Sequence, residues 1–485
     1  MLLRSLEELR KLYSRIQGSL VGVGMTAFSR IIPCEFTDNY RILCARATSD
    51  LSILESIVSI WSLERESRQR CPTSGFNSYT LLNHPASKAF LRGLEPPVNL
   101  FLYQSYPELE ELAVREGWVL LANKASLRKL VGGRGFFLKL VRQLGLPSIP
   151  GGIYPLKEFL NRGYGYWAGA LGPEIVVQLP DIGQGGGKGT FFVSSREEYE
   201  EIQERLKPGT WRGVRLKRVA LFKKLNAVAS SITLCITRHG VLMGPLQAQF
   251  MDMDTEPLEK GVFCGHSWGG IQWPISVEKE ARRQALLITQ KLNQLGYKGL
   301  LGIDFLIDLG RVVIYPKEIN PRLTGGLPML SMLLKEQGLP PLEAFHLLEF
   351  FGVSYEIDLQ ELNKGYQTSP KGSHVVVHTL SAPTILKASY MKAGVYVEEG
   401  GGGFVYKGPG WNYAHLSHPQ EFLVIDGPPG GDPRPLEVQD SLFRVCRILY
   451  SDPGIGEDFG PSTRLKRASK WIRESVLEDS SLPSL

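Results

Sequence analysis

Short apolar runs alternate with polar, helix-like stretches over residues 1–125. An amphipathic segment with charges of both signs, Met1–Gln17, comes first. The apolar runs are Ser19–Met25, Tyr40–Ala45, Val98–Tyr103 and Trp118–Ala122. Runs of this length, bounded by turn residues, are typical of buried strands, and strands that alternate with helices form parallel sheets. The pattern therefore predicts a doubly wound α/β domain over residues 1–125.

The next part of the chain begins with a helix that has a clear stop. The predicted helix is Phe136–Leu144, which Gly145 and Pro147 end. The elements expected after it are, in order, a strand Ile175–Leu179, a glycine-rich loop, a strand Thr190–Val193 and a capped helix from Ser194.

Further on, the pattern favours antiparallel pairing. We expect Val219–Leu225, Ser230–Thr237 and Val241–Phe250 to be strands of one antiparallel sheet, with a hairpin turn at residues 238–240. A helix Val277–Leu295 and a hairpin of Leu300–Ile307 with Val312–Ile319 follow. From residue 356 onward the strands are short and Gly and Pro are frequent, which predicts a separate, mostly β or α+β C-terminal domain over residues 356–485.

Length and composition restrict the class of protein. A chain of 485 residues is too long for one hydrophobic core, so several domains are expected. The six cysteines are scattered without a C-x-x-C pair, which argues against zinc and disulfides and suits a reducing cytosol. No apolar stretch reaches the roughly 20 residues that cross a bilayer. We therefore expect a cytoplasmic protein that has no membrane partner.

The formal charge of +6 is mild, and it fits an enzyme that acts on anions without requiring one. The densest basic stretch, Arg464–Lys470, is either a short nucleic-acid patch or the solvated face of a helix. We favour the helix, and expect no nucleic-acid partner. Gly22-x-Gly24-x-x-Ala27 is either the opening of a dinucleotide site or a tight turn after a strand. The loop-like segment Phe28–Pro33 favours the turn.

The chemistry concentrates at residues 302–326, in Gly-Ile-Asp-Phe and Glu-Ile-Asn-Pro-Arg-Leu-Thr-Gly-Gly. Glu318 and Asn320 are two residues apart on one strand and therefore face the same side, where Asp304 of the neighbouring strand can join them. Two carboxylates and an amide oxygen favour Mg²⁺ or Mn²⁺ over zinc. Arg322 is suited to neutralise a transferring phosphoryl group. The alternative, hairpin charges that face solvent, does not explain this tight spacing within apolar strands.

These residues resemble the signature of the ATP-grasp superfamily. The resemblance implies that Asp304, Glu318 and Asn320 bind magnesium and that Arg322 contacts the reacting phosphate or intermediate. It also implies a base ahead of a helix that ends in Gly-hydrophobic-Pro. Arg134 occupies that place, and Lys124 is the competing candidate.

The family also has a strand that ends in Lys, followed by a glycine-rich loop over the phosphates. Here Gln178 stands in the place of that Lys, where its amide can bond adenine or an α-phosphate oxygen. The loop Asp181–Thr190 contains Gly185, Gly186, Gly187 and Lys188, whose backbone N–H groups and charge suit phosphate oxygens. The loop is not a P-loop, because Gly189 follows the lysine where Ser or Thr is required.

Adenine is expected at a short linker that includes Leu221 and Phe222. Two polar segments, Gly244–Gln249 and Gly265–Gly270, are expected to be loops, either lining the cleft or purely structural. The resemblance divides the chain into a pre-ATP-grasp domain (1–125), two ATP-grasp subdomains (126–215 and 216–355) and the C-terminal domain. The fold class expected is thus α/β and α+β. Within the superfamily the chain is most similar to the peptide-ligase branch that includes the pheganomycin ligase.

The function expected from this resemblance is an ATP- and Mg²⁺-dependent ligase. It would join a small-molecule carboxylate to an amine through an acyl phosphate, with Arg322 and Lys188 as catalytic residues. Two alternatives stay open: an inactive nucleotide-binding regulatory protein, which Gln178 favours, and a small-molecule phosphotransferase. Dimers are frequent among the relatives, so a homodimer is compatible with the resemblance.

Overall fold

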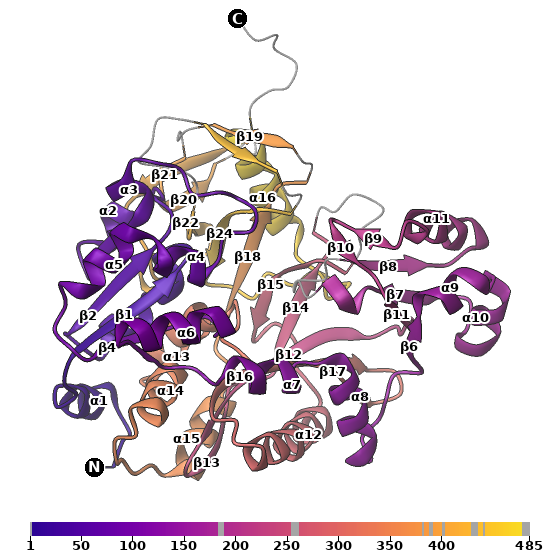
Figure 1. The fold of residues 1–485 in the computed structure, drawn as a ribbon, viewed down its shortest axis with the longest axis horizontal. Coiled ribbons are helices and arrows are strands. Elements are labelled where there is room, and N and C mark those ends of the chain that lie inside the picture. The colour runs from indigo at the N-terminus through magenta and orange to yellow at the C-terminus, as the bar shows by residue number, and fades with distance from the viewer. Residues whose placement is uncertain are drawn as a thin grey trace, which may run out of the picture.

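The computed structural model describes residues 2–182, 189–253, 261–380, 383–387, 391–399, 403–427, 435–439 and 442–477. Figure 1 shows a body built around one large sheet, with the N-terminal domain on one side and a small sheet with its helices on the other. In the part of the chain described, no helix combines the length and the apolar character needed to cross a membrane.

The N-terminal domain is a parallel sheet of five strands in the order β3-β2-β1-β4-β5. Its strands are β1 (Ser19–Gly24), β2 (Tyr40–Cys44), β3 (Ser59–Ser62), β4 (Val98–Phe101) and β5 (Val119–Leu120). Its helices are α1 (Leu6–Tyr13), α2 (Leu51–Leu54), α3 (Leu63–Ser67), α4 (Ser78–Asn83), α5 (Pro85–Arg92) and α6 (Pro107–Glu116). The predicted doubly wound sheet is confirmed. The pattern missed β3, because this four-residue strand has only two apolar residues, Ile60 and Trp61, between two serines.

Alternate residues of β1 face two different cores. Val21 and Val23 pack with the helices α4 to α6. Leu20 faces the other way, into a core that includes α1 and two helices from much later in the chain, α13 (Leu327–Glu336) and α14 (Leu342–Phe351). Helices thus cover both faces of the sheet. On one face, α13 and α14 attach the N-terminal domain to the segment that follows Arg322.

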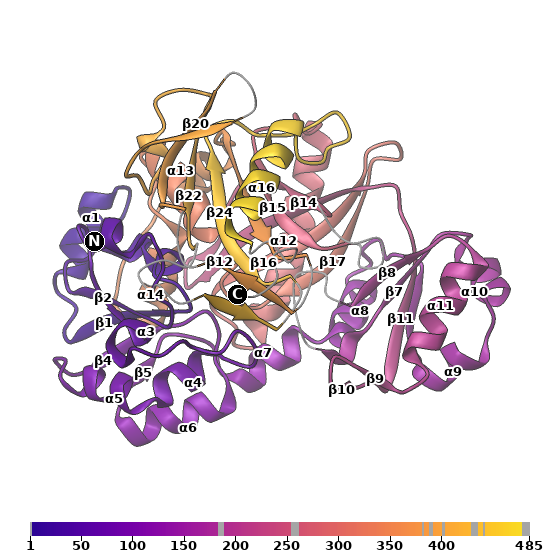
Figure 2. The same cartoon turned by 90° about the horizontal axis from the view of Figure 1, so that it is seen from above.

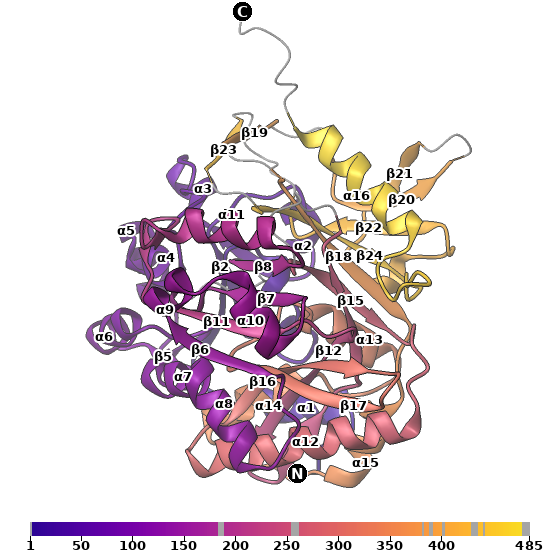
Figure 3. The same cartoon turned by 90° about the vertical axis from the view of Figure 1, so that its right-hand side faces the viewer.

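A second, smaller sheet is antiparallel, in the order β6-β11-β7-β8. Its strands are β6 (Gly151–Pro155), β7 (Ile175–Gln178), β8 (Thr190–Val193) and β11 (Arg218–Lys223). The helices α9 (Leu156–Asn161), α10 (Tyr164–Leu171) and α11 (Arg196–Leu206) cover it, and a ribbon of β9 (Thr210–Trp211) and β10 (Val214–Arg215) borders it. Figure 2 shows this unit projecting from the large sheet, and in Figure 3 it faces the viewer.

The prediction that Val219–Leu225 joins the later antiparallel sheet was wrong. β11 lies between β6 and β7, because Val219 and Leu221 are fully buried in the core of the smaller sheet. The chain passes to the large sheet only after Lys223.

The large sheet has eleven strands among the described residues, in the order β17-β16-β12-β14-β15-β18-β24-β22-β20-β21, with β13 on β12. The strands are β12 (Val228–Thr237), β13 (Gly240–Met243), β14 (Gln247–Met251), β15 (Phe263–Trp268), β16 (Gly299–Asp308), β17 (Val313–Asn320), β18 (Gly372–His378), β20 (Gly394–Glu398), β21 (Phe404–Gly408), β22 (Glu421–Ile425) and β24 (Arg444–Tyr450). A separate pair is β19 (Thr384–Leu386) with β23 (Leu436–Val438). Because β15 pairs with β18, hydrogen bonding continues across the expected domain boundary at residue 355.

Amphipathic helices cover the large sheet. They are α7 (Ala125–Val131), α8 (Arg134–Gln143), α12 (Ile275–Gln294), α15 (Leu359–Gln367) and α16 (Thr463–Val476). Buried residues of α12 such as Ala281 and Ile288 pack on β12, β16 and β17. On α16, Leu465 and Ala468 are buried while Lys466, Arg467 and Lys470 are exposed, as on a solvated helix face.

Two polar segments expected to be loops lie largely in strands. The predicted strand Val241–Phe250 divides into β13 and β14, because Pro245 between them has no N–H to donate. Residues 265–268 belong to β15, and part of Gly244–Gln249 belongs to β14. The polar pattern concealed these strands, since His266 and Trp268 are buried and find partners in His374 and Gln247.

Candidate functional site

The acidic cluster, our name for Asp304, Glu318 and Asn320, lies on the hairpin of β16 and β17. Asp304 is the direct partner of Glu318 across the pair, and Asn320 opposes Gly302. Asn320 Nδ2 donates to Asp304 Oδ2 at 3.1 Å and approaches Glu318 Oε1 at 3.4 Å. The structure therefore brings together the three side chains that the sequence indicated as metal ligands.

A β-bulge next to the cluster adds a residue that sequence analysis missed. Asp304 pairs with Glu318 but Phe305 pairs with Pro316, so Lys317 has no residue opposite. The buried positions of β17 shift phase at this point, from Ile314 and Pro316 to Ile319. Lys317 and Glu318 consequently share the face of the hairpin that turns away from the core.

The two carboxylates interact strongly in this partly buried place. Burial raises the pKa of Asp304 to about 8, and the neighbouring Glu318 charge adds to the rise. Burial acts on Glu318 in the same direction. The charges of Lys317 and Arg134 and the bond to Asp304 outweigh it, and the pKa of Glu318 lies below its usual value. A divalent cation would relieve the repulsion between the two facing carboxylates, and the donor set fits Mg²⁺.

Asn320 holds the next side chain in place. Its Oδ1 accepts a hydrogen bond from Arg322 Nη2 at 3.0 Å. The Arg322 guanidinium lies 5.0 Å from the centre of the Tyr103 ring and donates to the Tyr103 hydroxyl. With the amide in this orientation Nδ2 faces the carboxylates, so coordination through Oδ1 requires the amide to turn. Tyr103 was missed as a site residue. The signal for it was its place at the carboxyl end of a predicted parallel strand.

Arg134 joins the acidic cluster to the smaller sheet. From the start of α8 its Nη1 donates to the Lys317 carbonyl at 2.8 Å and its Nη2 to Gln178 Oε1 at 3.2 Å. The guanidinium lies 4.8 Å from the centre of the Phe222 ring. Its buried Nε forms no hydrogen bond with any described residue. Lys124, the competing candidate, is exposed at the start of α7, so geometry favours Arg134.

The remaining candidates surround Gln178 and the end of β11. Gln178 Nε2 approaches Thr190 Oγ1 at 3.4 Å, which fixes the amide at the strand end. The predicted phosphate-loop residues Gly185, Gly186, Gly187 and Lys188 lie outside the described residues.

Leu221 and Phe222 lie in β11, paired on both sides and buried, so their backbone is used within the sheet. A cavity of about 670 Å³ instead adjoins the segment after them, residues 223–229, together with the tip of the β16–β17 hairpin at Asp308–Arg311.

Within the described residues, no three His, Cys, Asp or Glu side chains gather as a metal site. Metal binding here thus depends on two carboxylates, an amide and oxygens from a ligand.

No protein-family model matches the sequence, and no curated protein does. Solved structures do share the fold. The biotin carboxylase domain of 2-oxoglutarate carboxylase from Hydrogenobacter thermophilus, crystallised with MgADP, ADP and bicarbonate, has a TM-score of 0.57 at 14% identity, covering 90% of this chain and 87% of that one.

Two further structures of similar likeness match this chain over almost their whole length. An ADP complex of N5-carboxyaminoimidazole ribonucleotide synthetase has a TM-score of 0.54 at 10% identity, covering 95% of this chain and 98% of that one. Phosphoribosylamine–glycine ligase from Thermotoga maritima has a TM-score of 0.54 at 13% identity, with 95% and 97% covered. The predicted fold class is thus confirmed, because this chain shares the overall fold of these three structures.

Proposed function

We propose that this protein is an ATP- and Mg²⁺-dependent ligase that joins a carboxylate to an amine through an acyl phosphate. The observation that carries the proposal is the acidic cluster, set between two sheets and flanked by the cations Arg134, Lys317 and Arg322. The likeness to a biotin carboxylase domain and to N5-carboxyaminoimidazole ribonucleotide synthetase, both crystallised with ADP, supports it. The finer expectation, a peptide ligase whose amine is an amino acid or peptide, belongs to this proposal.

Each residue of the cluster has a role in it. Asp304, Glu318 and Asn320 would hold Mg²⁺, which when bound neutralises phosphate charge and orients the transferring group. Arg134 faces the nucleotide from the side of the smaller sheet, where its hydrogen bond to Gln178 fixes the orientation of the guanidinium group. Arg322, held by Asn320 and Tyr103, lies on the other side, where the substrate carboxylate meets the γ-phosphate. Positioning and charge neutralisation are the main contributions to phosphoryl transfer.

Lys317 bears on the alternative that Gln178 favours, an inactive nucleotide binder. Replacing a lysine by Gln178 removes one positive charge from this wall of the cleft. The bulge supplies a positive charge on the opposite wall, because Lys317 shares a face with Glu318. The Lys317 charge acts to lower the pKa of both carboxylates. Lys188 and the three glycines before it complete the proposal as the phosphate-covering loop, and the base is proposed to lie at the end of β11, beyond Leu221 and Phe222.

The test is ADP release from the purified protein with Mg²⁺, ATP and pooled amino acids. Glu318→Gln removes one charge from the cluster, and Glu111→Gln, exposed on α6, is its matched control. We expect substrate-stimulated release that Glu318→Gln abolishes and Glu111→Gln preserves. ATP binding without release in any pool would favour the regulatory protein. Release that continues without an amine and yields a stable phosphorylated product would identify a phosphotransferase.

A further inference from the structure

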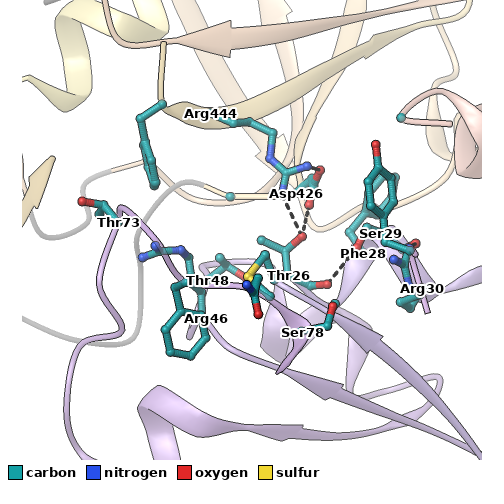
Figure 4. Close-up of a pocket in the computed structure, with 18 of the residues that line it drawn as sticks. Thr26, Phe28, Ser29, Arg30, Arg46, Thr48, Thr73, Ser78, Asp426 and Arg444 are labelled. Atoms are coloured by element: carbon teal, nitrogen blue, oxygen red, sulfur yellow. Dashed lines mark hydrogen bonds and ion pairs between the residues drawn. The ribbon is translucent and has the colours of Figure 1, made fainter. Parts of the chain in front are cut away.

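A second cavity, of about 460 Å³, lies between the N-terminal sheet and the C-terminal strands. One wall consists of segments that follow β1, β2 and β4, and carries Thr26, Arg46 and Tyr103. The opposite wall carries Asp426 and Arg444, at the end of β22 and the start of β24 (Figure 4). Ligands of open α/β sheets bind outside the carboxyl ends of the strands where the order reverses, here at β1 between β2 and β4. The volume is that of a small-molecule site.

Arginine dominates the charge of this cavity, which we call the arginine cavity. Among the described residues that line it are two carboxylates and five arginines: Glu64, Asp426, Arg30, Arg46, Arg70, Arg444 and Arg447. The excess is three positive charges. Like charges gathered in a partly buried space repel one another, so an anionic ligand would stabilise the cluster.

Both carboxylates are already used by the fold. Glu64 accepts from the backbone N–H groups of Ala47 at 3.0 Å and Cys71 at 2.9 Å. Asp426 is fully buried and bridges the two walls. Its Oδ2 accepts from Arg447 Nε at 2.7 Å and pairs with Arg444 Nη1 at 2.9 Å, while Thr26 donates to its Oδ1. Neither acid is therefore placed to bind a cationic ligand.

Two of the arginines that line the cavity keep hydrogen-bonding capacity. Arg444 bonds Asp426 and Thr26, yet its side chain is 28% exposed. Arg46 packs its guanidinium 5.1 Å from the centre of the Phe443 ring. Its buried Nη1 forms no hydrogen bond with any described residue and lies 3.6 Å from Glu64. One arginine comes from each wall, so the pair is complete only when the C-terminal strands lie on the N-terminal sheet.

The arginine cavity reaches the proposed reaction site. Thr324 and Gly325 line it, directly after Arg322, and so does Tyr103, which holds Arg322. The loop leads into α13, whose Pro328 lies on the same cavity wall. A molecule in the cavity can thus present a carboxylate to Arg322 while the rest of it extends toward Arg46 and Arg444.

We propose that the arginine cavity binds the carboxylate substrate, and that this substrate carries a second anionic group recognised by Arg46 and Arg444. The inference rests on the proposed function and names its substrate class: a dicarboxylate or a phosphorylated carboxylate. Guanidinium groups bind either anion through paired, charge-assisted hydrogen bonds. The aromatic residues Phe28, Phe76 and Phe443 line the cavity and would cover the carbon skeleton between the two anions.

Calorimetry on the full chain, saturated with MgADP, tests this with three probes. Glutarate carries two carboxylates, butyrate carries one, and 3-phosphoglycerate carries a phosphate and a carboxylate. We expect butyrate to bind at least tenfold more weakly than the better of the two dianions. Tighter binding of 3-phosphoglycerate identifies a phosphate as the second group, and tighter binding of glutarate a carboxylate. Binding of neither dianion, or equal binding of butyrate, overturns the proposal.

Two variants locate the binding. Arg444→Gln and Arg46→Met should each weaken dianion binding at least tenfold and leave MgADP binding unchanged. Arg46→Met keeps the stem on Phe443, and it carries the test if Arg444→Gln, next to buried Asp426, does not fold. Arg283→Gln, on the exposed face of α12, is the control. Wild-type dianion affinity in both folded variants would refute the assignment. A protein that binds MgADP but no dianion refutes this inference alone, whereas one that binds a dianion but no MgADP refutes the proposed function alone.

Discussion

The acidic cluster and the arginine cavity lie next to each other and differ in the sign of the charge that gathers in them. In the cluster two carboxylates face each other, and Lys317, Arg134 and Arg322 surround them. Five arginines line the arginine cavity, and its two carboxylates already accept hydrogen bonds from the protein itself. The first arrangement suits a divalent cation with phosphates, and the second suits an organic anion. Tyr103, Arg322 and Thr324 lie between them.

The difference matters because each region is incomplete in a different way. The cluster has too few protein ligands for a metal without oxygens from a nucleotide, whereas the cavity has more cations than the fold itself uses. A ligase that phosphorylates a carboxylate needs both conditions side by side. The predictions below separate the two regions, beginning with the largest expected effect.

Asp304→Asn should remove turnover while sparing the arginine cavity. We expect ADP release to fall on the order of 1000-fold, because a carboxylate ligand to the metal is lost. The free energy of unfolding without metal should not fall, since the change removes one of two facing buried carboxylates. ADP release, chemical denaturation and glutarate binding measure the three properties. A variant that loses glutarate binding together with turnover would show that the regions are not separable.

Arg134→Lys tests how the cluster is joined to the smaller sheet. A lysine cannot bond the Lys317 carbonyl and Gln178 together as the planar fork does. We expect KM for ATP to rise roughly tenfold or more, and the free energy of unfolding to fall by about 1–3 kcal/mol, because buried acceptors are left unpaired. Arg142→Lys, exposed on the same helix, is the control. Unchanged kinetics would mean that the fork has no part in nucleotide binding.

Lys317→Gln tests whether the bulge supplies the charge that Gln178 lacks. MgADP affinity should fall about tenfold, and Lys317→Arg should restore most of it, since a charge rather than a particular shape is required. Lys279→Gln, exposed on α12, should change nothing. If the Gln variant binds MgADP as well as wild type does, Lys317 serves the fold of the bulge and not the nucleotide.

How far the sequence predicted these regions follows from how their residues are spaced. The acidic cluster and Arg322 occupy one hairpin and the residues directly after it, so the two-residue period of a strand placed them. The arginine cavity draws Arg30, Arg46, Asp426 and Arg444 from segments hundreds of residues apart, and only the packed fold brings them together. Local pattern carries no information on such pairing.

Two smaller failures have the same origin. Val219–Leu225 was recognised as a strand but placed in the wrong sheet, because its apolar pattern does not specify its partners. Lys317 was overlooked because strict alternation would turn it away from Glu318. A bulge breaks that alternation, and the local residue pattern did not predict the bulge. Strand positions were thus predictable, while partners and register irregularities were not.

The smallest predicted effect concerns two histidines between the regions. His266 Nδ1 lies 2.9 Å from His374 Nε2, and His374 Nδ1 lies 3.3 Å from Arg447 Nη1. Because arginine only donates, His374 Nδ1 accepts, its Nε2–H donates to His266, and both rings are neutral. Burial and the Arg447 charge lower the pKa of His266 to about 3 and that of His374 well below its usual value.

The contribution of this pair to stability should therefore depend on pH in one direction. Below about pH 6.5 the unfolded chain binds protons that the two folded rings do not bind, so each ring lowers the free energy of unfolding by about 0.8 kcal/mol at pH 6. Buried His346, whose pKa is also lowered, acts in the same direction, and Asp304, whose pKa is raised, acts in the opposite one. The test is therefore the difference between variant and wild type in chemical denaturation at pH 7.5 and pH 6. Between these two pH values the free energy of unfolding of His266→Gln should rise relative to wild type by about 0.8 kcal/mol, and His415→Gln, a histidine outside this pair, should show the pH dependence of wild type. An unchanged pH dependence in His266→Gln would mean that the His266–His374 pair does not distinguish the two protonation states.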